Sequence, residues 1–286
     1  MSALFLIGVV VQYFGYSLAV MLADSTPMWL IGSARAFFSG LIFLAVGLVL
    51  ARRSARMSRE GLLLGIVASV MNIASFGAAG TLPLGVATAL EFVGPIALAA
   101  VAARSARSAI MVMSGLAGVV VLYLRVGVPQ FADTAGLGLL LALASAALWA
   151  TYIRLGHSTE SVQERLVGFG IGLALGGVST GLIASGVGDA SPWTTMTLST
   201  WGQLVGIAVL ASVVPYVIDL LCLKVMSPHT FAILTVTLPA VAALLGWLIL
   251  GQTLGWWGLL GLCLVVVSLL LLRTGDGATS SQGSER

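Results

Sequence analysis

Long apolar runs alternate with short polar breaks along the whole chain. Breaking the sequence at charges, prolines and glycine clusters gives runs close to the roughly 20 helical residues that cross a bilayer core of about 30 Å. The ten runs cover 4–22, 28–50, 61–80, 82–103, 109–124, 135–154, 166–187, 201–222, 229–250 and 254–272. Because the connections are short, the pattern predicts an all-α integral membrane protein with ten transmembrane helices and no separate soluble domain.

The composition supports a chain whose solvent is lipid. Apolar residues make up 59% and charged residues 8%, whereas a soluble domain carries about 25% charged residues. The net charge of +3 does not indicate a nucleic-acid partner, because most basic residues lie in the breaks between runs, as membrane topology requires. The chain has no Gly-Lys-Ser/Thr phosphate loop, so ATP-driven transport is not expected.

Basic residues gather on one predicted side of the membrane. With the N-terminus inside, the outer face carries Arg125, and the inner face carries Arg52, Arg53, Arg56, Arg59, Arg104, Arg107, Arg154, Arg165, Lys224, Arg273 and Arg286. This bias predicts that both termini are cytoplasmic. The first run has no basic stretch before it and is interpreted as a membrane span rather than a signal peptide. The polar segment 274–286 is predicted to be a disordered cytoplasmic tail.

Short matches at one offset indicate an internal repeat. Gly115 and Gly118 recur as Gly258 and Gly261, 143 residues later, and the prolines at 95 and 239 and two Ser-Val pairs follow nearly the same offset. The matches predict two five-helix repeats, 1–127 and 133–273. Because five is odd, the second repeat is inverted, as in alternating-access transporters whose site lies near the midplane. Duplication without transport, as in a scaffold, is the alternative.

Glu91 is the only ionisable residue between Leu82 and Ala103. It lies near the middle of its run, where an ionised acid costs a few kcal/mol to insert. It is therefore expected to face the protein interior or a water-filled cavity and to bind substrate or a proton. The alternative is a protonated acid that bonds a neighbouring helix for structural reasons.

Pro95 lies four residues after Glu91 and lacks the N–H that would bond the Glu91 carbonyl. The kink is expected to free that carbonyl, and Gly94 is expected to leave one side of the kink open for an ammonium group or a proton. A packing kink without such a role is the alternative.

The second predicted repeat carries Pro215 and Pro239. By the same rule these prolines release the carbonyls of Ala211 and Thr235. Together with Gly94 and Pro95, they are predicted to form helix kinks that allow gating.

Two further polar residues are candidates for binding substrate or a proton. Arg35, in the second run, is expected to bind a carboxylate or balance Glu91, unless it reaches outward to the interface. Asn72 is expected to bond Glu91 or the ligand, or to form a structural bond between helices. Candidates for lining the cavity are Gln12, Tyr16, Thr88, Trp149, Tyr152, Tyr216 and Thr235, although the aromatic ones also suit an interfacial belt.

Enzymatic chemistry is not expected. The stretch Gly177 to Gly181 fits G-x-S-x-G, but His157 and His229 lie on the predicted cytoplasmic side, away from Ser179. A serine nucleophile needs a base within reach, so an intramembrane enzyme is a remote alternative. No metal-ligand spacing or cofactor motif is present, and neither a metal nor a cofactor is expected.

The stretch TLPLGVATALEFVGPIALA, residues 81–99, resembles the EamA branch of the drug/metabolite transporter superfamily, and within it the bacterial threonine/homoserine exporters. The likeness continues through VMN (70–72), LALASAALWATYI (141–153), VVPYVIDLLCL (213–223) and LPAVAALLGWLILGQTL (238–254). The resemblance implies a ten-helix exporter of the bacterial inner membrane, made of two inverted repeats and driven by the proton gradient. It implies a small-molecule substrate, namely small amino acids or related metabolites. Separately from the resemblance, a monomer or homodimer is expected.

Two positions depart from the family pattern. Such exporters tend to carry an acid before the second-half proline and a G-E-T-L stretch, whereas this chain has Leu238 and Gln252. The substrate is therefore open, and export of hydrophobic cations or drugs is the alternative.

Overall fold

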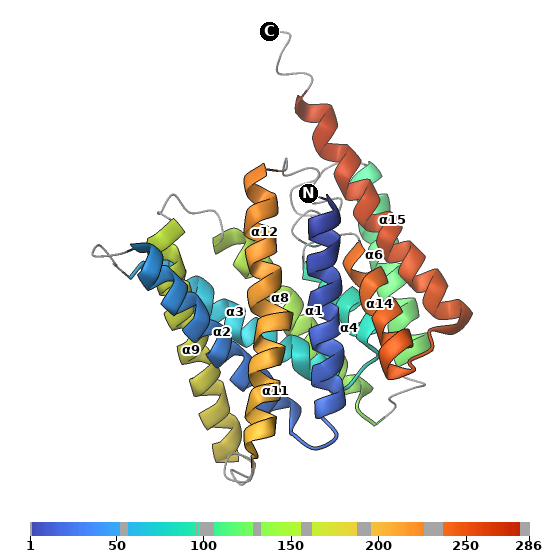
Figure 1. The fold of residues 1–286 in the computed structure, drawn as a ribbon. Coiled ribbons are helices and arrows are strands. Elements are labelled where there is room, and N and C mark those ends of the chain that lie inside the picture. The colour runs from blue at the N-terminus through green and yellow to red at the C-terminus, as the bar shows by residue number, and fades with distance from the viewer. Residues whose placement is uncertain are drawn as a thin grey trace.

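The structure is a computed structural model that describes residues 2–51, 57–94, 97, 106–127, 133–155, 162–187, 196–225 and 237–280. All regular secondary structure in these residues is helical. The helices are α1 (Ser2–Leu22), α2 (Met28–Ala51), α3 (Arg59–Ala79), α4 (Leu84–Glu91), α6 (Ala106–Leu122), α8 (Ala135–Leu155), α9 (Val162–Val187), α11 (Leu198–Ala208), α12 (Val214–Val225), α14 (Thr237–Leu250) and α15 (Gly255–Ser280), as Figure 1 shows. Two π-helical segments, η2 (Tyr123–Gly127) and η3 (Val209–Val213), continue α6 and join α11 to α12.

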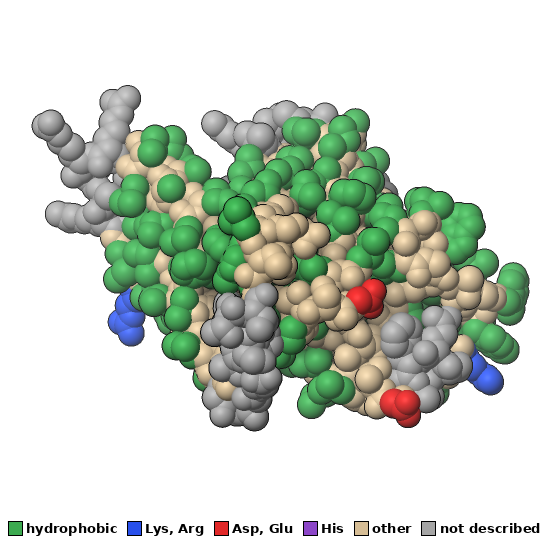
Figure 2. Space-filling view, turned by 60° about the horizontal axis from the view of Figure 1, so that its bottom comes forward, with side chains coloured by type: hydrophobic (Ala, Val, Ile, Leu, Met, Phe, Trp, Pro, Cys, Tyr) green, Lys and Arg blue, Asp and Glu red, His purple; other side chains and the backbone are tan. Residues whose placement is uncertain are grey.

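The described helices match the apolar runs of the sequence. Nine of the ten runs correspond to one α-helix each, and the run 201–222 holds α11, η3 and α12. Six helices in the described residues are long and apolar enough to cross a membrane, and 113–126, 237–250 and 255–267 form shorter apolar helices. Large apolar side chains cover the outside; Leu198 is 89% exposed and Trp256 is 74% exposed. Figure 2 shows few charged side chains among the hydrophobic ones on one end of the molecule. Such a surface is expected when lipid is the solvent.

The start of α1 and the end of α15 lie at the same end of the bundle (Figure 1), as an even number of crossings requires. The beginning of the C-terminal tail differs from the sequence prediction, because α15 continues as far as Ser280. No proline interrupts the segment 274–280, and a helix already nucleated propagates through glycines at about 1 kcal/mol each. Residues 281–286 lie outside the described part of the chain.

The glycine-rich stretch from Gly168 to Gly177 lets α9 pack closely against both α2 and α3. On one side, a Cβ on Gly170 would meet the backbone of Leu44 in α2; on the other, a Cβ on Gly172 would meet the carbonyl of Leu62 in α3. Small residues let helix backbones approach in a membrane, where dispersion rather than the hydrophobic effect drives packing. This stretch therefore serves close packing of α9 against its two neighbours.

Two glycines from the predicted repeat meet each other in space. A Cβ on Gly118 of α6 would lie 2.6 Å from the carbonyl oxygen of Gly261 in α15, and one on Gly261 would lie 2.9 Å from the carbonyl oxygen of Gly118. The other main packing partners are α2 with α9, α3 with α8 and α9, α4 with α14, and α1 with η3, α12 and α14. Helices from the two ends of the sequence are thus interleaved rather than separated.

Candidate functional site

Helix α4 lies in the centre of the molecule and ends at the acidic residue of the sequence. Every residue from Leu84 to Leu90 is buried, and Glu91, the last one, is partly exposed. The Glu91 carboxyl lies close to the hydroxyls of Ser75 and Ser145 and within electrostatic range of Arg35. The acid therefore faces other polar groups inside the protein rather than lipid.

The helix geometry changes directly after Glu91. The Phe92 N–H bonds the carbonyl of Ala89, three residues back, at 3.2 Å, which tightens the last turn. Pro95 lies outside the described residues, so the release of the Glu91 carbonyl stays a prediction. The expectation that Gly94 leaves an open side is wrong, because a Cβ at this position would collide with the carbonyl of Ala146 in α8. The glycine allows the segment that follows α4 to pack closely against α8, a contact that local sequence reasoning does not predict.

Arg35 lies inside the protein and does not reach the interface. Its side chain is 1% exposed, and its Nη2 donates a hydrogen bond of 2.8 Å to the carbonyl oxygen of Ala211. The guanidinium lies over the ring of Phe76 at 4.3 Å and over that of Tyr16 at 5.2 Å. The Nε and Nη1 groups are buried and have no hydrogen-bond partner among the described residues.

The acceptor for Arg35 exists because of a proline in the second half of the chain. In a regular helix the N–H of residue 215 would bond the carbonyl of Ala211, but Pro215 has no N–H. The ladder shifts here to π-type bonds, with the Val214 N–H on the carbonyl of Val209. A π-bulge next to a proline is a common way to rearrange the ladder. The carbonyl left over is the one that Arg35 binds.

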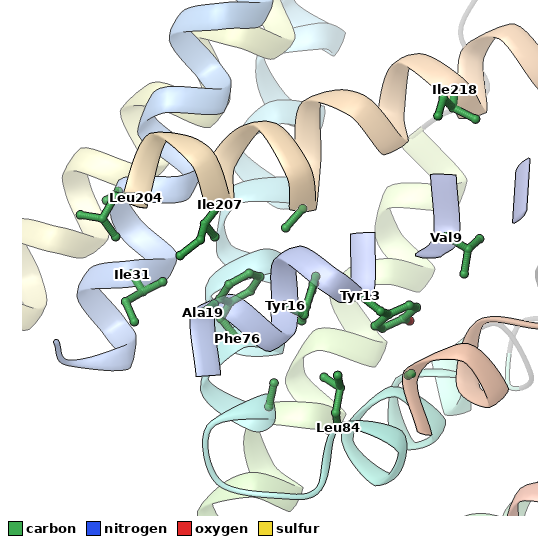
Figure 3. Close-up of a cluster of buried hydrophobic side chains, with 14 of the residues drawn as sticks. Val9, Tyr13, Tyr16, Ala19, Ile31, Phe76, Leu84, Leu204, Ile207 and Ile218 are labelled. Atoms are coloured by element: carbon green, nitrogen blue, oxygen red, sulfur yellow. The ribbon is translucent and has the colours of Figure 1, made fainter. Parts of the chain in front are cut away.

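Aromatic and hydroxyl groups connect Arg35 to Glu91. The Tyr16 hydroxyl and Ser75 Oγ form a hydrogen bond of 3.1 Å. Tyr16 and Phe76 have ring centroids 4.3 Å apart, and Figure 3 shows both in one buried cluster with Tyr13 and Ile207. The Thr88 hydroxyl, one helical turn before Glu91, lies close to Tyr13.

Asn72 is also buried, at 4% exposure. It precedes Ser75 and Phe76 by three and four positions in α3, so it lies on the same face of that helix. The structure thus gathers Glu91, Arg35, Asn72, Tyr16 and Thr88 around one part of the core.

Other predicted site residues lie elsewhere. Trp149 packs edge-on against Phe92 at 4.9 Å, beside the end of α4. Tyr216 and Tyr152 pack in a second aromatic cluster that contains Phe43 and Phe169; the Phe169 and Tyr216 centroids are 5.8 Å apart. Gln12 is partly exposed on α1. Thr235 lies outside the described residues.

Pro239 does not kink the described part of α14. It is the third residue of that helix and is buried. A proline in the first helical turn disturbs no ladder bond within the helix, because the N–H groups there lack intrahelical partners.

Gln252 has a position that sequence reasoning missed. Its Oε1 accepts a hydrogen bond of 2.8 Å from the N–H of Leu84, the first residue of α4. The residue before Leu84 is Pro83, which offers no side-chain cap, so a glutamine from the α14–α15 turn caps α4 instead. An uncapped buried helix start was the signal available in the sequence, but it does not identify the partner.

Comparison with known proteins decides the family. A profile described as the EamA-like transporter family matches residues 136–274. The threonine/homoserine exporter RhtA of Salmonella typhimurium (strain LT2) is 30% identical over 224 residues, which cover 76% of this chain and 72% of the exporter. The chain belongs to the EamA-like transporter family. RhtA of Escherichia coli K12 is 29% identical over 210 residues, covering 71% of this chain and 67% of that exporter.

A solved crystal structure supports the fold of this EamA-like transporter. It aligns with a TM-score of 0.60 over 95% of this chain and 96% of the other, at 20% identity. The resemblance drawn from residues 81–99 is therefore confirmed at the level of the family. The cluster around Glu91 and Arg35 lies within a helical membrane protein of a transporter family.

Proposed function

We propose that the chain is a secondary active transporter of the bacterial plasma membrane that exports small amino acids, of the threonine and homoserine type, or related metabolites. The relatives that match most of the chain are exporters of such compounds. The observation that carries the proposal is Glu91, an acid at the end of a fully buried helix, partly accessible and surrounded by hydroxyls and one arginine.

The packing of the helices supports two inverted repeats. If each helix is exchanged for its counterpart five spans away, the observed neighbours map onto one another. The pair α3 and α8 corresponds to α12 with α1, and the pair α4 and α8 corresponds to α14 with α1. The pairs α2 with α9, α4 with α14 and α6 with α15 map onto themselves, as a two-fold axis in the membrane plane requires. The family match at 136–274 nearly coincides with the proposed second repeat, 133–273.

In this proposal Glu91 alternates between the substrate ammonium group and a proton. Both neutralise the Glu91 carboxylate. The two repeats can then change between the inward-facing and outward-facing states without exposing an unpaired carboxylate to the core. Asn72 is proposed to orient the ligand from α3. The proton gradient drives export because, after the substrate has left, Glu91 binds a proton outside and releases it into the cytoplasm. The positive-inside bias places both termini in the cytoplasm.

The test is threonine transport into proteoliposomes with an imposed pH gradient. Glu91→Gln is expected to lower the proton-driven rate at least about tenfold, since the amide cannot exchange a proton for an ammonium group. The matched control is Glu60→Gln, which removes an exposed acid in the first turn of α3 and is expected to transport as the wild type does. Wild-type rates for Glu91→Gln would show that the acid is structural.

Export of hydrophobic cations is the second candidate, favoured by the aromatic rings of Tyr16, Phe76, Phe92 and Trp149 near the site. Competition separates the two. Zwitterionic amino acids are expected to inhibit threonine transport, whereas lipophilic cations inhibit strongly only if the second candidate holds.

A further inference from the structure

The arginine near Glu91 has more hydrogen-bonding capacity than the protein uses. A guanidinium has five N–H donors. Arg35 gives one bond to the Ala211 carbonyl and lies near the Tyr16 hydroxyl, while Nε and Nη1 have no acceptor within hydrogen-bond distance among the described residues. An unsatisfied buried polar group costs roughly 1–3 kcal/mol, and more when it is charged. Unpaired donors in a buried group require an explanation. The exchange of a proton for an ammonium group at Glu91 does not explain those of Arg35.

The surroundings fix the orientation of this guanidinium while leaving donors free. Phe76, 4.3 Å away, and Tyr16, 5.2 Å away, both place a ring beside the guanidinium. The bond from Nη2 to Ala211 holds one corner. A planar group held in this way presents its remaining N–H donors in a fixed direction, which suits a planar, two-oxygen acceptor.

The charges nearby select the kind of acceptor. Glu91 lies within electrostatic range of Arg35, so the site holds one positive and one negative group. A phosphate dianion would be repelled by Glu91, and a simple cation would be repelled by Arg35. A zwitterion with a carboxylate at one end and an ammonium group at the other matches both. Ser145 Oγ, buried beside the Glu91 carboxyl, adds a neutral donor.

We infer that Arg35 is the receptor for the α-carboxylate of the exported amino acid, while Glu91 receives its ammonium group. The inference rests on the proposed function and adds the second anchor of the substrate. Bonds between arginine and a carboxylate are about twice as strong as bonds between neutral groups, so a carboxylate is a strong acceptor for the Nε and Nη1 donors that the protein leaves without a partner. Because Nε and Nη1 are enclosed in this conformation, the carboxylate reaches them when α1 and η3 move apart.

The experiment compares threonine with 1-amino-2-propanol, which is threonine without its carboxylate. Binding of both is measured by calorimetry on purified wild-type, Arg35→Gln and Arg35→Lys proteins. Arg35→Gln is expected to weaken threonine about 10- to 100-fold, the range for losing hydrogen bonds to a charged group. The amine is expected to bind equally or more tightly, because Glu91 loses a competing cation.

Equal weakening of threonine and the amine in Arg35→Gln would overturn the inference, since Arg35 would then act only through Glu91. Arg35→Lys keeps the charge without the planar donors and is expected to weaken threonine more than the amine. Arg35→Lys decides the question if Arg35→Gln does not fold. Unchanged threonine binding by Arg35→Lys would also overturn the inference. If the wild type neither binds nor transports threonine, the proposed function itself fails, which is a different result.

Discussion

Helices α4 and α14 occupy corresponding places in the two proposed repeats and pack against each other, yet they differ in surroundings and polarity. A Cβ on Gly85 in α4 would lie 2.8 Å from Cβ of Ala243 in α14. Residues 84–90 of α4 are buried on all sides, and the next residue is Glu91. In α14 the buried residues form one face, while Trp247 and Leu248 are more than half exposed.

The difference makes the site asymmetric within the proposed two-repeat scaffold. Among the described residues, the α4 side alone combines an acid with the serines and the arginine that surround it. On the α14 side, Leu238 packs against two apolar clusters. A duplicated architecture can thus preserve helix packing while the polar chemistry remains in one half.

The largest effect is expected from placing an acid on the apolar side. Leu238→Glu should cost about 2.5–3.5 kcal/mol, the range for a charge inside a membrane helix, because it enters apolar clusters. Combined with Glu91→Gln, it should not restore transport. The melting temperature in detergent and threonine transport in proteoliposomes measure the two effects. Restored transport in the double variant would mean that the halves are interchangeable.

Two glycines offer a steric version of the same comparison. Gly94→Ala is expected to cost about 2 kcal/mol or more, because the new methyl meets the rigid backbone of Ala146 in α8. Gly246→Ala in α14 meets the Oε1 end of the Gln252 side chain at 2.8 Å. This side chain is able to rotate away, which loses its bond to Leu84, so the expected cost is about 1 kcal/mol. Thermal unfolding of both variants in the same detergent is the measurement. Equal losses would contradict the close approach of α4 to α8.

The cap on α4 is expected to have a smaller effect. Gln252→Ala removes the acceptor for the Leu84 N–H and should destabilise the protein by about 1 kcal/mol, as loss of a helix cap does. Gln252→Glu keeps an acceptor and is expected to be close to the wild type, since a negative charge suits a helix start. The stability difference between these two variants decides whether the contact is a cap.

The two serines beside Glu91 should give the smallest changes in stability. Ser75→Ala removes the bond to Tyr16 and is expected to cost about 1 kcal/mol. Ser145→Ala removes a buried hydroxyl that lies beside the Glu91 carboxyl but has no partner within hydrogen-bond distance among the described residues. Its loss should therefore change stability by less than about 0.5 kcal/mol. Unfolding temperatures measure both, and a larger loss in Ser145→Ala than in Ser75→Ala would show that Ser145 is bonded after all.

The sequence was sufficient to predict the membrane helices, because a run of about 20 apolar residues is long enough to cross a bilayer as a helix. The motif at residues 81–99 was sufficient to predict the family. The proline rule also identified the Ala211 carbonyl as a free acceptor. It could not identify the donor, since Arg35 is 176 positions away and only the packing of α2 against α11 and η3 brings the two together.

The wrong or missing predictions concern contacts between residues that are far apart in the sequence. Gly94 was expected to border an open space because a kink exposes a carbonyl, but α8 fills that space. The cap at Leu84 was equally invisible, because Gln252 follows it by 168 positions. Hydropathy patterns predict which segments cross the membrane, whereas contacts between helices depend on register and rotation that the patterns do not contain.

The bond between Arg35 and Ala211 has a consequence for how this contact is inherited. Its acceptor belongs to the main chain, so no substitution at position 211 deletes the oxygen itself. What makes the oxygen available is the ring of Pro215, one turn later. A search for residues that coevolve with Arg35 should therefore find its signal at position 215. Pro215 contributes to the contact because it lacks the backbone N–H that would otherwise bond the Ala211 carbonyl.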